Sequence, residues 1–600
     1  MALFLAIAAT VAVPPEEDAF IYYRYAWNWA HGHGLVFNLG DPVEGFSGPL
    51  WMAVLGLVAR AGFDLPRAAP LLGVSCGAAT IVATFALARH AGLGSWGRLG
   101  SAAAVALAEP HLVWSRSGLE TPLYALLLTV ACALHLGSES ERERRAAHQR
   151  GAQWRVGIAL SAVVLCRPES ILLLLLVGVD RLHRSDRAGA IRYLAPAAVG
   201  YGALVAWRHA TFGSLVPNTS VKLYTPLVAR STAQAASYVL SIGVWPAMLP
   251  LAALVGSRDR GSPDRHTIGF LFTASLLLSF FFDFVAGGDY RPGFRYFVPT
   301  LPILLVAGWV ALESIERSRA LRRRGTAALR TTPGAIPAGG TRSLASAAVA
   351  RPGLRLPCLL LTLAAPLHAR LANPPALSQW RERVLATWLD PYSDRSRTGV
   401  ATARWMDANV RPGSVVAFGQ MGMVPYYLAV RGHDVTFVDT LGLVDRAVAR
   451  HYRMGAKLAD LVRRVRSGAS LARALDDGRR DRAQAVADEI LGRSPDYVLL
   501  ETELDANGML QALASSPAFR SDYPEIAAIP SADEPRVRVH ARSAPPSPPA
   551  TPAALVPGRR LSRMIPLGHG RAPCISSAVH AQAAARSSAP SRSPSGADSR

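Results

Sequence analysis

The chain has 600 residues, of which half are hydrophobic, and its mean hydropathy is positive. Its apolar residues are gathered in blocks, which excludes an ordinary soluble protein and predicts an integral membrane protein. A net charge of +22 would suggest nucleic acid as the partner of a soluble chain. Here most arginines lie in short loops between apolar blocks or in the C-terminal third, so membrane topology explains them and no nucleic-acid partner is expected.

Apolar blocks long enough, or nearly long enough, to cross a bilayer recur along the chain. The first lacks the basic flank and cleavage site of a signal peptide and is interpreted as a short first span. The block at 47–62 is interrupted and is assigned to the membrane interface as a juxtamembrane helix. The expected spans are 1–13, 68–88, 99–114, 120–136, 193–209, 236–256, 266–286, 295–312 and 355–369, with two shorter blocks, 154–166 and 170–182, on either side of the sequence CRPES.

Arginine-rich loops mark one side of the membrane as cytoplasmic. These loops all fall on the same side of the membrane if the chain makes 11 passes and the CRPES pair of blocks crosses twice. The basic loops are those near 89–98, 142–155, 181–192, 258–265 and 317–324. The loops left on the outer side are 14–66, 115–119, 210–235 and 287–294, together with everything after about residue 370. We therefore expect one face of the membrane to carry the chemistry.

The C-terminal third differs in composition from the apolar part. Residues 325–353 are of low complexity and are interpreted as a cytoplasmic linker. A predicted helix, SDRSRTGVATARWMDANV, and the predicted strands SVVAFG, DVTFVD and PDYVLLE indicate an extracytoplasmic α/β domain over 371–540. The tail 541–600 is rich in Pro, Ser, Ala and Arg and is expected to be disordered or the product of a shifted reading frame. The cysteines show neither a disulfide framework nor metal-thiolate spacing.

The segment after the first span places acids next to aromatics. If it is helical from Asp18, then Asp18, Tyr22, Tyr25 and Trp29 share one face, and Glu17 shares a neighbouring face with Arg24. A carboxylate beside aromatic rings suits a sugar, which stacks its C–H faces and needs partners for its hydroxyl groups. The alternative is a helix start favoured by acids, followed by an interfacial aromatic belt.

The other outer loops also carry charged and amide groups. Each has an ordinary explanation as a turn or an interfacial residue, but their coincidence on one face indicates a site. Guanidinium groups of this kind clamp phosphate. The residues are Arg116 and Glu120 in SRSGLETPLY, Asn218 and Lys222 in VPNTSVKLY, and Asp289, Arg291 and Arg295 in VAGGDYRPGFRYFVP.

Two further motifs receive weaker interpretations. Arg167 and Glu169 of CRPES are expected to be an internal charge pair rather than catalytic groups. His31 and His33 are metal-ligand types, but their spacing in a Gly-rich turn is a weak metal signal. No internal repeat of the kind that transporters carry is evident.

Six motifs in order resemble the GT-C glycosyltransferases, in particular the branch of the mycobacterial terminal arabinofuranosyltransferase and of flagellar motor control proteins. They are EDAFIYYRYAWNWAHGHGLVFNLGDPVEGFSGPLW, SGLETPLYALLL, CRPES, VPNTSVKL, GGDYRPGFRYFVPTLPILL and VDTLGLVD. The resemblance runs from about Glu17 to about Leu500, without 325–353. It implies a mainly α fold with about 11 membrane helices. It also implies a multi-pass enzyme of the bacterial inner membrane whose active site is extracytoplasmic.

The same resemblance implies transfer of a sugar, with arabinofuranose favoured, from a polyprenyl-phosphate donor to a cell-envelope glycan or protein. The family commonly carries Asp-Asp in its first outer loop, where this chain has Glu17 and Asp18. Asp18 is then the expected general base, with Glu17 as the second catalytic acid. Non-catalytic assistance in envelope or flagellar assembly is the alternative function, and a transporter is a less favoured one.

Substrate contacts follow from the same comparison. Lys222, Arg291 and Arg295 are expected to hold the lipid phosphate, and Glu17, Asp18, Glu120 or Asp289 to bind sugar hydroxyls or a divalent cation, Mg²⁺ or Mn²⁺. The remaining expected substrate contacts are Tyr22, Arg24, Tyr25 and Asn218.

Overall fold

A computed structural model describes most of the chain outside its C-terminal tail. The described residues are 1–10, 14–140, 146–184, 186–222, 228–241, 245–256, 263–286, 294–331, 397–501, 508–529 and 537–543. The expected span at 355–369 lies outside them, as do residues 332–353 of the expected linker and the tail from residue 544.

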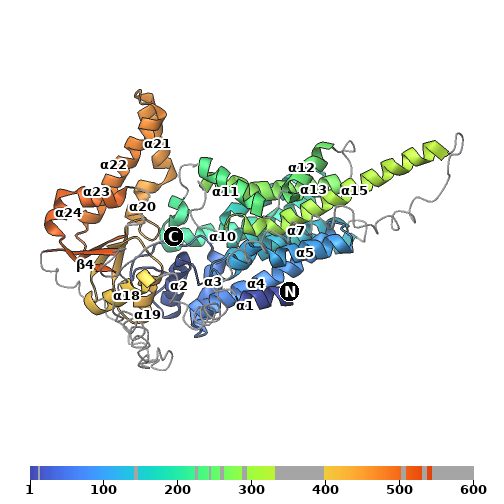
Figure 1. The fold of residues 1–600 in the computed structure, drawn as a ribbon. Coiled ribbons are helices and arrows are strands. Elements are labelled where there is room, and N and C mark those ends of the chain that lie inside the picture. Colours follow the sequence, from blue (N-terminus) through green and yellow to red (C-terminus); the bar gives the residue numbers. More distant parts are fainter. Residues whose placement is uncertain are drawn as a thin grey trace, which may run out of the picture. The chain divides into compact units, whose positions relative to one another are not determined.

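The part before residue 332 is helical (Figure 1). Its elements are α1 (Ala2–Thr10), α2 (Glu17–Ala30), α3 (Pro49–Arg60), α4 (Leu65–His90), α5 (Ser95–Leu107), α6 (Glu109–Ser115), α7 (Thr121–Ser140), α8 (Ala146–Cys166), η1 (Pro168–Ser170), α9 (Ile171–His183), α10 (Arg187–Phe212), η2 (Asn218–Lys222), α11 (Val228–Ser241), α12 (Trp245–Gly256), α13 (Pro263–Ser275), the π-helical segment η3 (Leu276–Phe281), α14 (Phe282–Ala286), η4 (Val298–Thr300) and α15 (Leu301–Thr331).

Four helices in the described part of the chain are long and apolar enough to cross a membrane. They span Leu65–His90, Thr121–Ser138, Pro263–Val285 and Val298–Ala320. These four coincide with the expected blocks 68–88, 120–136, 266–286 and 295–312. The count of 11 passes stays a prediction.

Several boundaries differ from the sequence expectation. The block 99–114 is two helices, because Pro110 cannot supply an N–H to a helix running through it and Ala108 is extended, with φ −66° and ψ 117°. Helix α8 has 21 residues, longer than the apolar block 154–166, because its polar first turns are helical as well. Helix α15 continues to Thr331, so residues 325–331 of the expected linker are helical.

Polar contacts gather the loops that the sequence assigns to the cytoplasm. Asp180 at the end of α9 accepts from His266 Nε2 of α13 at 2.6 Å. Arg317 of α15 donates to Asp264 of α13 at 2.7 Å. The described residues next to three of the basic loops therefore lie at one end of the helices, as expected from the distribution of arginine. Which end faces the cytoplasm stays a prediction.

Residues 397–543 contain a five-stranded sheet in the order β2-β1-β3-β5-β4. Strand β1 is parallel to β2 and β3, whereas β5 is antiparallel to β3 and β4. The first three strands lie where SVVAFG, DVTFVD and PDYVLLE were expected. The strands are β1 (Val415–Phe418), β2 (Thr436–Asp439), β3 (Tyr497–Glu501), β4 (Glu525–Ile529) and β5 (Val537–Ala541).

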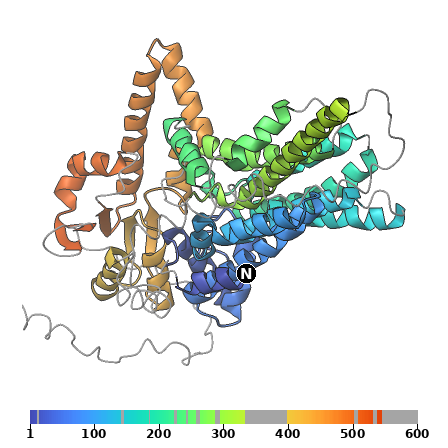
Figure 2. The same cartoon turned by 45° about the vertical axis from the view of Figure 1, so that its right-hand side comes forward.

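Helices connect and cover this sheet. Helix α19 links β1 to β2, and α21 pairs with α22 as a helical hairpin (Figure 2). The helices are α18 (Arg397–Asn409), α19 (Met423–Val430), α20 (Arg446–Tyr452), α21 (Met454–Arg466), α22 (Leu471–Gly492), α23 (Met509–Ser515) and α24 (Pro517–Asp522).

Helix α2 shares its hydrophobic core with this α/β part. Phe20 and Tyr23 of α2 are fully buried, and each ring centroid lies 5.8 Å from that of Tyr426 of α19. The two sets of residues form one contiguous apolar cluster. Burial of three aromatic rings stabilises this contact by several kcal/mol, at roughly 1.5–3 kcal/mol for each fully buried apolar side chain.

Candidate active site

Helix α2 turns the acidic pair toward two different partners. Glu17 and Asp18 occupy its first turn, where the helix dipole favours carboxylates. Successive residues of a helix point about 100° apart, because a turn takes about 3.6 residues. Glu17 and Asp18 therefore point in different directions, and the structure gives them separate partners. The helix ends at His31, whose ring lies exposed against Trp27 O at 2.8 Å.

Asp18 faces Arg295. Its Oδ2 lies 3.3 Å from Arg295 Nη1. Arg295 Nη2 donates to the Tyr296 hydroxyl at 3.1 Å, and the guanidinium lies 5.8 Å from the centroid of the Trp114 ring. Phe294, directly before Arg295, has a φ of +61°, a strained value for an aromatic residue. The chain thus turns sharply where it presents this guanidinium, and two residues expected at the site from separate outer loops are in contact.

A second charged cluster surrounds Arg167. Its Nη1 donates to Glu120 Oε1 at 2.6 Å, and its Nε forms an ion pair with Glu169. The guanidinium also lies over the rings of Tyr124 and Phe282, at 5.9 and 5.8 Å from their centroids. The expected internal pair at CRPES therefore exists, and Glu120 is its third member.

A small pocket of about 10 Å³ lies between the two clusters. Its lining combines two guanidinium groups, a carboxylate, two tyrosines and apolar side chains. The lining residues are Thr121, Tyr124, Arg167, Glu169, Leu278, Phe282, Arg295, Tyr296 and Pro299. Since Leu278 and Phe282 belong to the candidate span Pro263–Val285, a candidate membrane helix forms one wall of the pocket. Sequence reasoning missed Tyr124 and Tyr296 as lining residues, although both lie within motifs that carry the resemblance.

Tyr22 and Tyr25 are buried in the first outer loop. Tyr22 accepts a hydrogen bond from Gly48 N at 3.0 Å, and burial raises its pKa well above the usual value. Tyr25 donates to Val43 O at 2.5 Å and accepts from Gly45 N at 2.9 Å. Both hydroxyl groups hold the backbone of the loop in place, and the expected substrate contacts of these tyrosines stay predictions.

Glu17 caps a helix of the α/β part. Its Oε1 accepts from Gly422 N at 3.0 Å and from Met423 N at 2.9 Å. These N–H groups belong to the start of α19, where backbone donors are unsatisfied within the helix and the dipole favours an anion. The expected role of Glu17 as a catalytic acid finds no support in this position.

Arg24 lies in the same interface between α2 and the α/β part, which we call the joint. It is 4% exposed and donates to Phe37 O at 2.8 Å and to Pro425 O at 2.6 Å. Burial lowers its pKa to about 10. Its donors point to backbone carbonyl groups, and Arg24 is not among the residues that line the pocket, so its expected contact with substrate stays a prediction.

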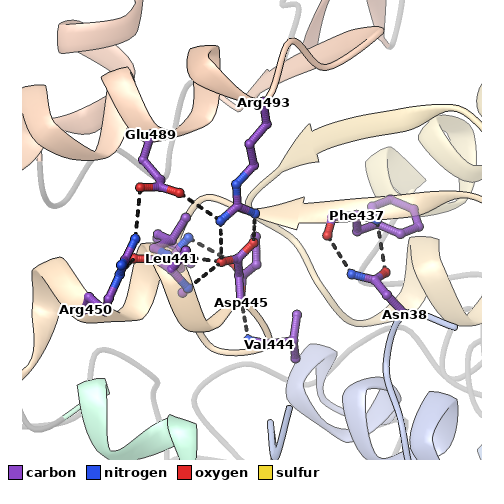
Figure 3. A network of polar contacts seen from close by, with 12 residues as sticks. Asn38, Phe437, Leu441, Val444, Asp445, Arg450, Glu489 and Arg493 are labelled. Carbon is purple, nitrogen blue, oxygen red and sulfur yellow. Dashed lines mark hydrogen bonds and ion pairs between the residues drawn. The ribbon is translucent and has the colours of Figure 1, made fainter. Parts of the chain in front are cut away.

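Two asparagines complete the joint. Asn218 Nδ2 donates to Gly442 O at 2.7 Å and to Leu443 O at 3.1 Å, and its expected contact with substrate stays a prediction. Asn38 exchanges two hydrogen bonds with the backbone of Phe437, at 2.8 and 3.0 Å. Figure 3 shows the Asn38 amide directed at the backbone of Phe437, with both hydrogen bonds drawn.

The loop VDTLGLVD owes its shape to two aspartates. Asp439 is fully buried, and its carboxylate accepts from Leu441 N at 2.8 Å and Val444 N at 2.9 Å. Burial raises the pKa of Asp439 to about 7, and the charge of Asp445 acts in the same direction. Asp445 caps α20 and pairs with Arg493, which also reaches Glu489 (Figure 3).

The expected cation site was tested on the donors present. Glu17 is engaged by two backbone N–H groups, and Asp18 faces a guanidinium, so the acidic pair does not fit a shared metal ion. Among the residues that the structure describes, no three His, Cys, Asp or Glu side chains are grouped to hold one. Three expected site residues cannot be placed. Asp289 and Arg291 lie outside the described residues, and only the backbone of Lys222, at the end of η2, is described.

Comparison with known proteins gives matches of two kinds. Residues 386–544 match a family model described as a domain of unknown function, DUF8728. Comparison with curated proteins gave no match. Among solved structures, the chain is similar to ArnT from Cupriavidus metallidurans, at 18% identity and a TM-score of 0.44, covering 90% of this chain and 97% of that one.

Two further solved structures are similar. The Archaeoglobus fulgidus oligosaccharyltransferase has 12% identity and a TM-score of 0.41, covering 87% of this chain and 72% of that one. The arabinofuranosyltransferase AftD from Mycobacteria has 15% identity and a TM-score of 0.44, covering 90% of this chain and 41% of that one. All three are GT-C superfamily glycosyltransferases, the superfamily that the sequence motifs resemble. TM-scores below 0.5 do not establish a common activity, so the function proposed below rests on the residues of the site.

Proposed function

We propose that the chain is a membrane glycosyltransferase of the GT-C type, transferring a sugar from a polyprenyl-phosphate donor to a hydroxyl group of a cell-envelope acceptor at the outer face of the membrane. The observation that carries this proposal is the 3.3 Å contact between Asp18 Oδ2 and Arg295 Nη1, because Arg295 also lines a pocket next to a candidate membrane helix. The contact brings together a base and a cation for a phosphate, beside a wall formed by that helix.

The chemistry assigns a part to each group. The acceptor oxygen forms a bond to the anomeric carbon while the bond from that carbon to the phosphate oxygen breaks, and polyprenyl phosphate leaves. Asp18 takes the proton of the acceptor hydroxyl, a contribution of roughly 10²–10⁴-fold to the rate. Arg295 stabilises the charge that develops on the departing phosphate. A single displacement of this kind inverts the anomeric configuration.

The ion pair also prevents the base from acting without a donor. In the free enzyme Arg295 neutralises Asp18. A bound phosphate competes for the guanidinium, so Asp18 is released as a base when a donor is present. Leu278 and Phe282 then lie beside the polyprenyl chain, which stays in the hydrocarbon because the pocket adjoins their helix.

The particular substrates come from the sequence resemblance. It favours arabinofuranose as the sugar and an envelope glycan or protein as the acceptor. Glu120 and Asp289 are the remaining candidate ligands for a divalent cation, since the Glu17–Asp18 pair does not fit a shared one.

Asp18→Asn tests this function. The variant is introduced into a deletion strain, and lipid-linked sugars and envelope glycans are analysed together. We expect the donor to accumulate and the glycan product to be lost, as in the empty-vector strain. Asp488→Asn, on the exposed face of α22, is the matched control and should restore both pools. Normal glycans with Asp18→Asn would show that the chain acts without this base, as in the non-catalytic alternative.

A further inference from the structure

We propose that Glu17 is a positioning residue, and that the α/β part, residues 397–543, is a working part of the active site because it fixes the orientation of Asp18 through Glu17. This inference rests on the proposed function, since it takes Asp18 as the base. It assigns a role to the part of the chain that matches a domain of unknown function.

The contact between Glu17 and α19 is close and specific. Gly422 has no side chain, and a Cβ added there would lie 2.6 Å from Glu17 Oε1, closer than real contacts of this kind. The loop 419–422 that carries Gly422 follows β1, a strand flanked by parallel neighbours on both sides. Anions bind α/β folds at this place, beyond the carboxyl end of a parallel strand and at a helix N-terminus. Here the chain's own carboxylate takes the position.

A second bond holds α2 two turns further on. Residues 17 and 24 are seven apart, so they lie on one face of α2. Arg24 Nη1 donates to Pro425 O at 2.6 Å, whereas Glu17 accepts from Gly422 and Met423 N–H groups. Helix α2 therefore binds the start of α19 both through backbone N–H groups, which donate to Glu17, and through the backbone carbonyl of Pro425, which accepts from Arg24. Since Phe20 and Tyr23 pack on Tyr426 between these two bonds, α2 cannot rotate about its axis without breaking them.

Rotation of α2 would remove Asp18 from Arg295. A helix with its side chains is about 10–12 Å across, so a turn of about 30° moves a side-chain end by about 3 Å. That displacement is as large as the 3.3 Å contact itself. Misplacement of a reacting group by about 1 Å can reduce a rate about 10²-fold. Glu17 thus affects the chemistry through Asp18 and does not need to touch substrate.

Four variants of the full-length chain test the inference: Glu17→Ala, Glu17→Gln, Asp18→Asn and, as a matched control, Glu109→Ala. Glu109 is also an acid in the first turn of a helix, but it is exposed at the start of α6. The assay uses polyprenyl phosphate carrying a radiolabelled pentose or hexose, with envelope from the deletion strain as acceptor. It gives kcat and the KM for the donor. Hydrogen exchange of residues 419–430 in the same samples reports capping of α19 independently of activity.

We expect Glu17→Ala to lower kcat about 10²-fold, to leave the donor KM within about threefold, and to speed exchange of residues 419–430. Glutamine retains an oxygen that accepts from both N–H groups, so Glu17→Gln should keep most of the activity and of the protection. Asp18→Asn should lose activity with unchanged exchange. Glu109→Ala should resemble the wild type in both measurements.

The outcomes separate the two proposals. A normal kcat in Glu17→Ala despite faster exchange would overturn the positioning role and leave the proposed function intact. Glu17→Gln as inactive as Asp18→Asn would also overturn it, because it would make the charge of Glu17 a participant in the chemistry. An active Asp18→Asn would overturn the proposed function instead. If Glu17→Ala does not accumulate, the comparison of Glu17→Gln with Asp18→Asn decides the inference alone.

Discussion

Asp18 and Arg295 stand 277 residues apart in the chain, yet their charged atoms lie 3.3 Å apart. Neither residue belongs to the joint with the α/β part, which takes Glu17 and Arg24. The first outer loop therefore divides its polar residues between a site and a joint, and the two acids at its start belong to different ones.

Arg295 is expected to serve the donor phosphate. Arg295→Gln should lower kcat about 10²–10³-fold, the usual cost of removing one donor to a developing anion. Arg295→Lys should fall between this variant and the wild type, because lysine keeps the charge but loses the planar fork. Steady-state transfer kinetics measure both variants, with Arg463→Gln, at an exposed arginine of α21, as the control. Equal activities in the glutamine and lysine variants would contradict a role for the charge.

Arg167 is expected to be needed for stability. Arg167→Met leaves two buried carboxylates, Glu120 and Glu169, without their cation, and it should cost about 3–5 kcal/mol of unfolding free energy. Adding Glu120→Gln to the same chain should recover part of the loss, because one uncompensated charge is removed. Thermal unfolding of the purified chain in detergent measures both effects. A double variant less stable than Arg167→Met would contradict this account.

Asp439 predicts a pH dependence of the α/β part. Its pKa of about 7 in the folded chain exceeds the usual 3.8, so the folded chain holds a proton that the unfolded chain releases. Its contribution to stability is therefore complete below about pH 4, falls as the pH rises to about 7, and is constant above that. The loss through this window is at most on the order of 4 kcal/mol, at about 1.4 kcal/mol for each pKa unit.

Asp439→Asn should flatten this dependence, because an amide does not titrate. The comparison is the hydrogen exchange of β2 and the following loop between pH 4.5 and 7.5, corrected for intrinsic exchange. Asp481→Asn, at an exposed aspartate of α22, should retain the wild-type slope. Parallel slopes in the wild type and Asp439→Asn would show that another group titrates.

Asn218 is expected to hold the loop VDTLGLVD against the membrane helices. Asn218→Asp places a carboxylate against the carbonyl oxygens that now accept its hydrogen bonds, at a cost of roughly 1–3 kcal/mol for the lost bonds alone. Limited proteolysis should then cut more rapidly between residues 440 and 446. Asn409→Asp is the matched control, because Asn409 is exposed and bonds only within α18. Unchanged proteolysis of Asn218→Asp would contradict the contact.

The sequence located the candidate site through residue chemistry and membrane parity. Parity places the loops of Asp18 and Arg295 on one side, and the structure brings these two residues together. The strands β1, β2 and β3 were predictable because each is a short β-branched or aromatic run between turn residues. Arg167 could be identified as a member of an internal ion pair, because a charged side chain among apolar residues needs a partner of opposite charge.

Other assignments could not be made from residue type alone. Arg24 and Asn218 have the groups that a substrate site uses, but the same groups also bind backbone carbonyls, and only tertiary contacts decide between the two uses. Glu17 looks like half of a catalytic pair because it adjoins Asp18 in the chain. Its partner, the start of α19, lies 405 residues away, and no local pattern indicates that contact.

Asn38 affects how the α/β part would behave if it were separated from the rest of the chain. Strand β2 ends the sheet, and an unpaired strand at that position templates the addition of another chain. The Asn38 amide occupies both backbone groups of Phe437 and so interrupts that template with a side chain from the first outer loop. A fragment made of residues 386–544 alone would lose this protection, and its tendency to self-associate would report what the N-terminal loop contributes to solubility.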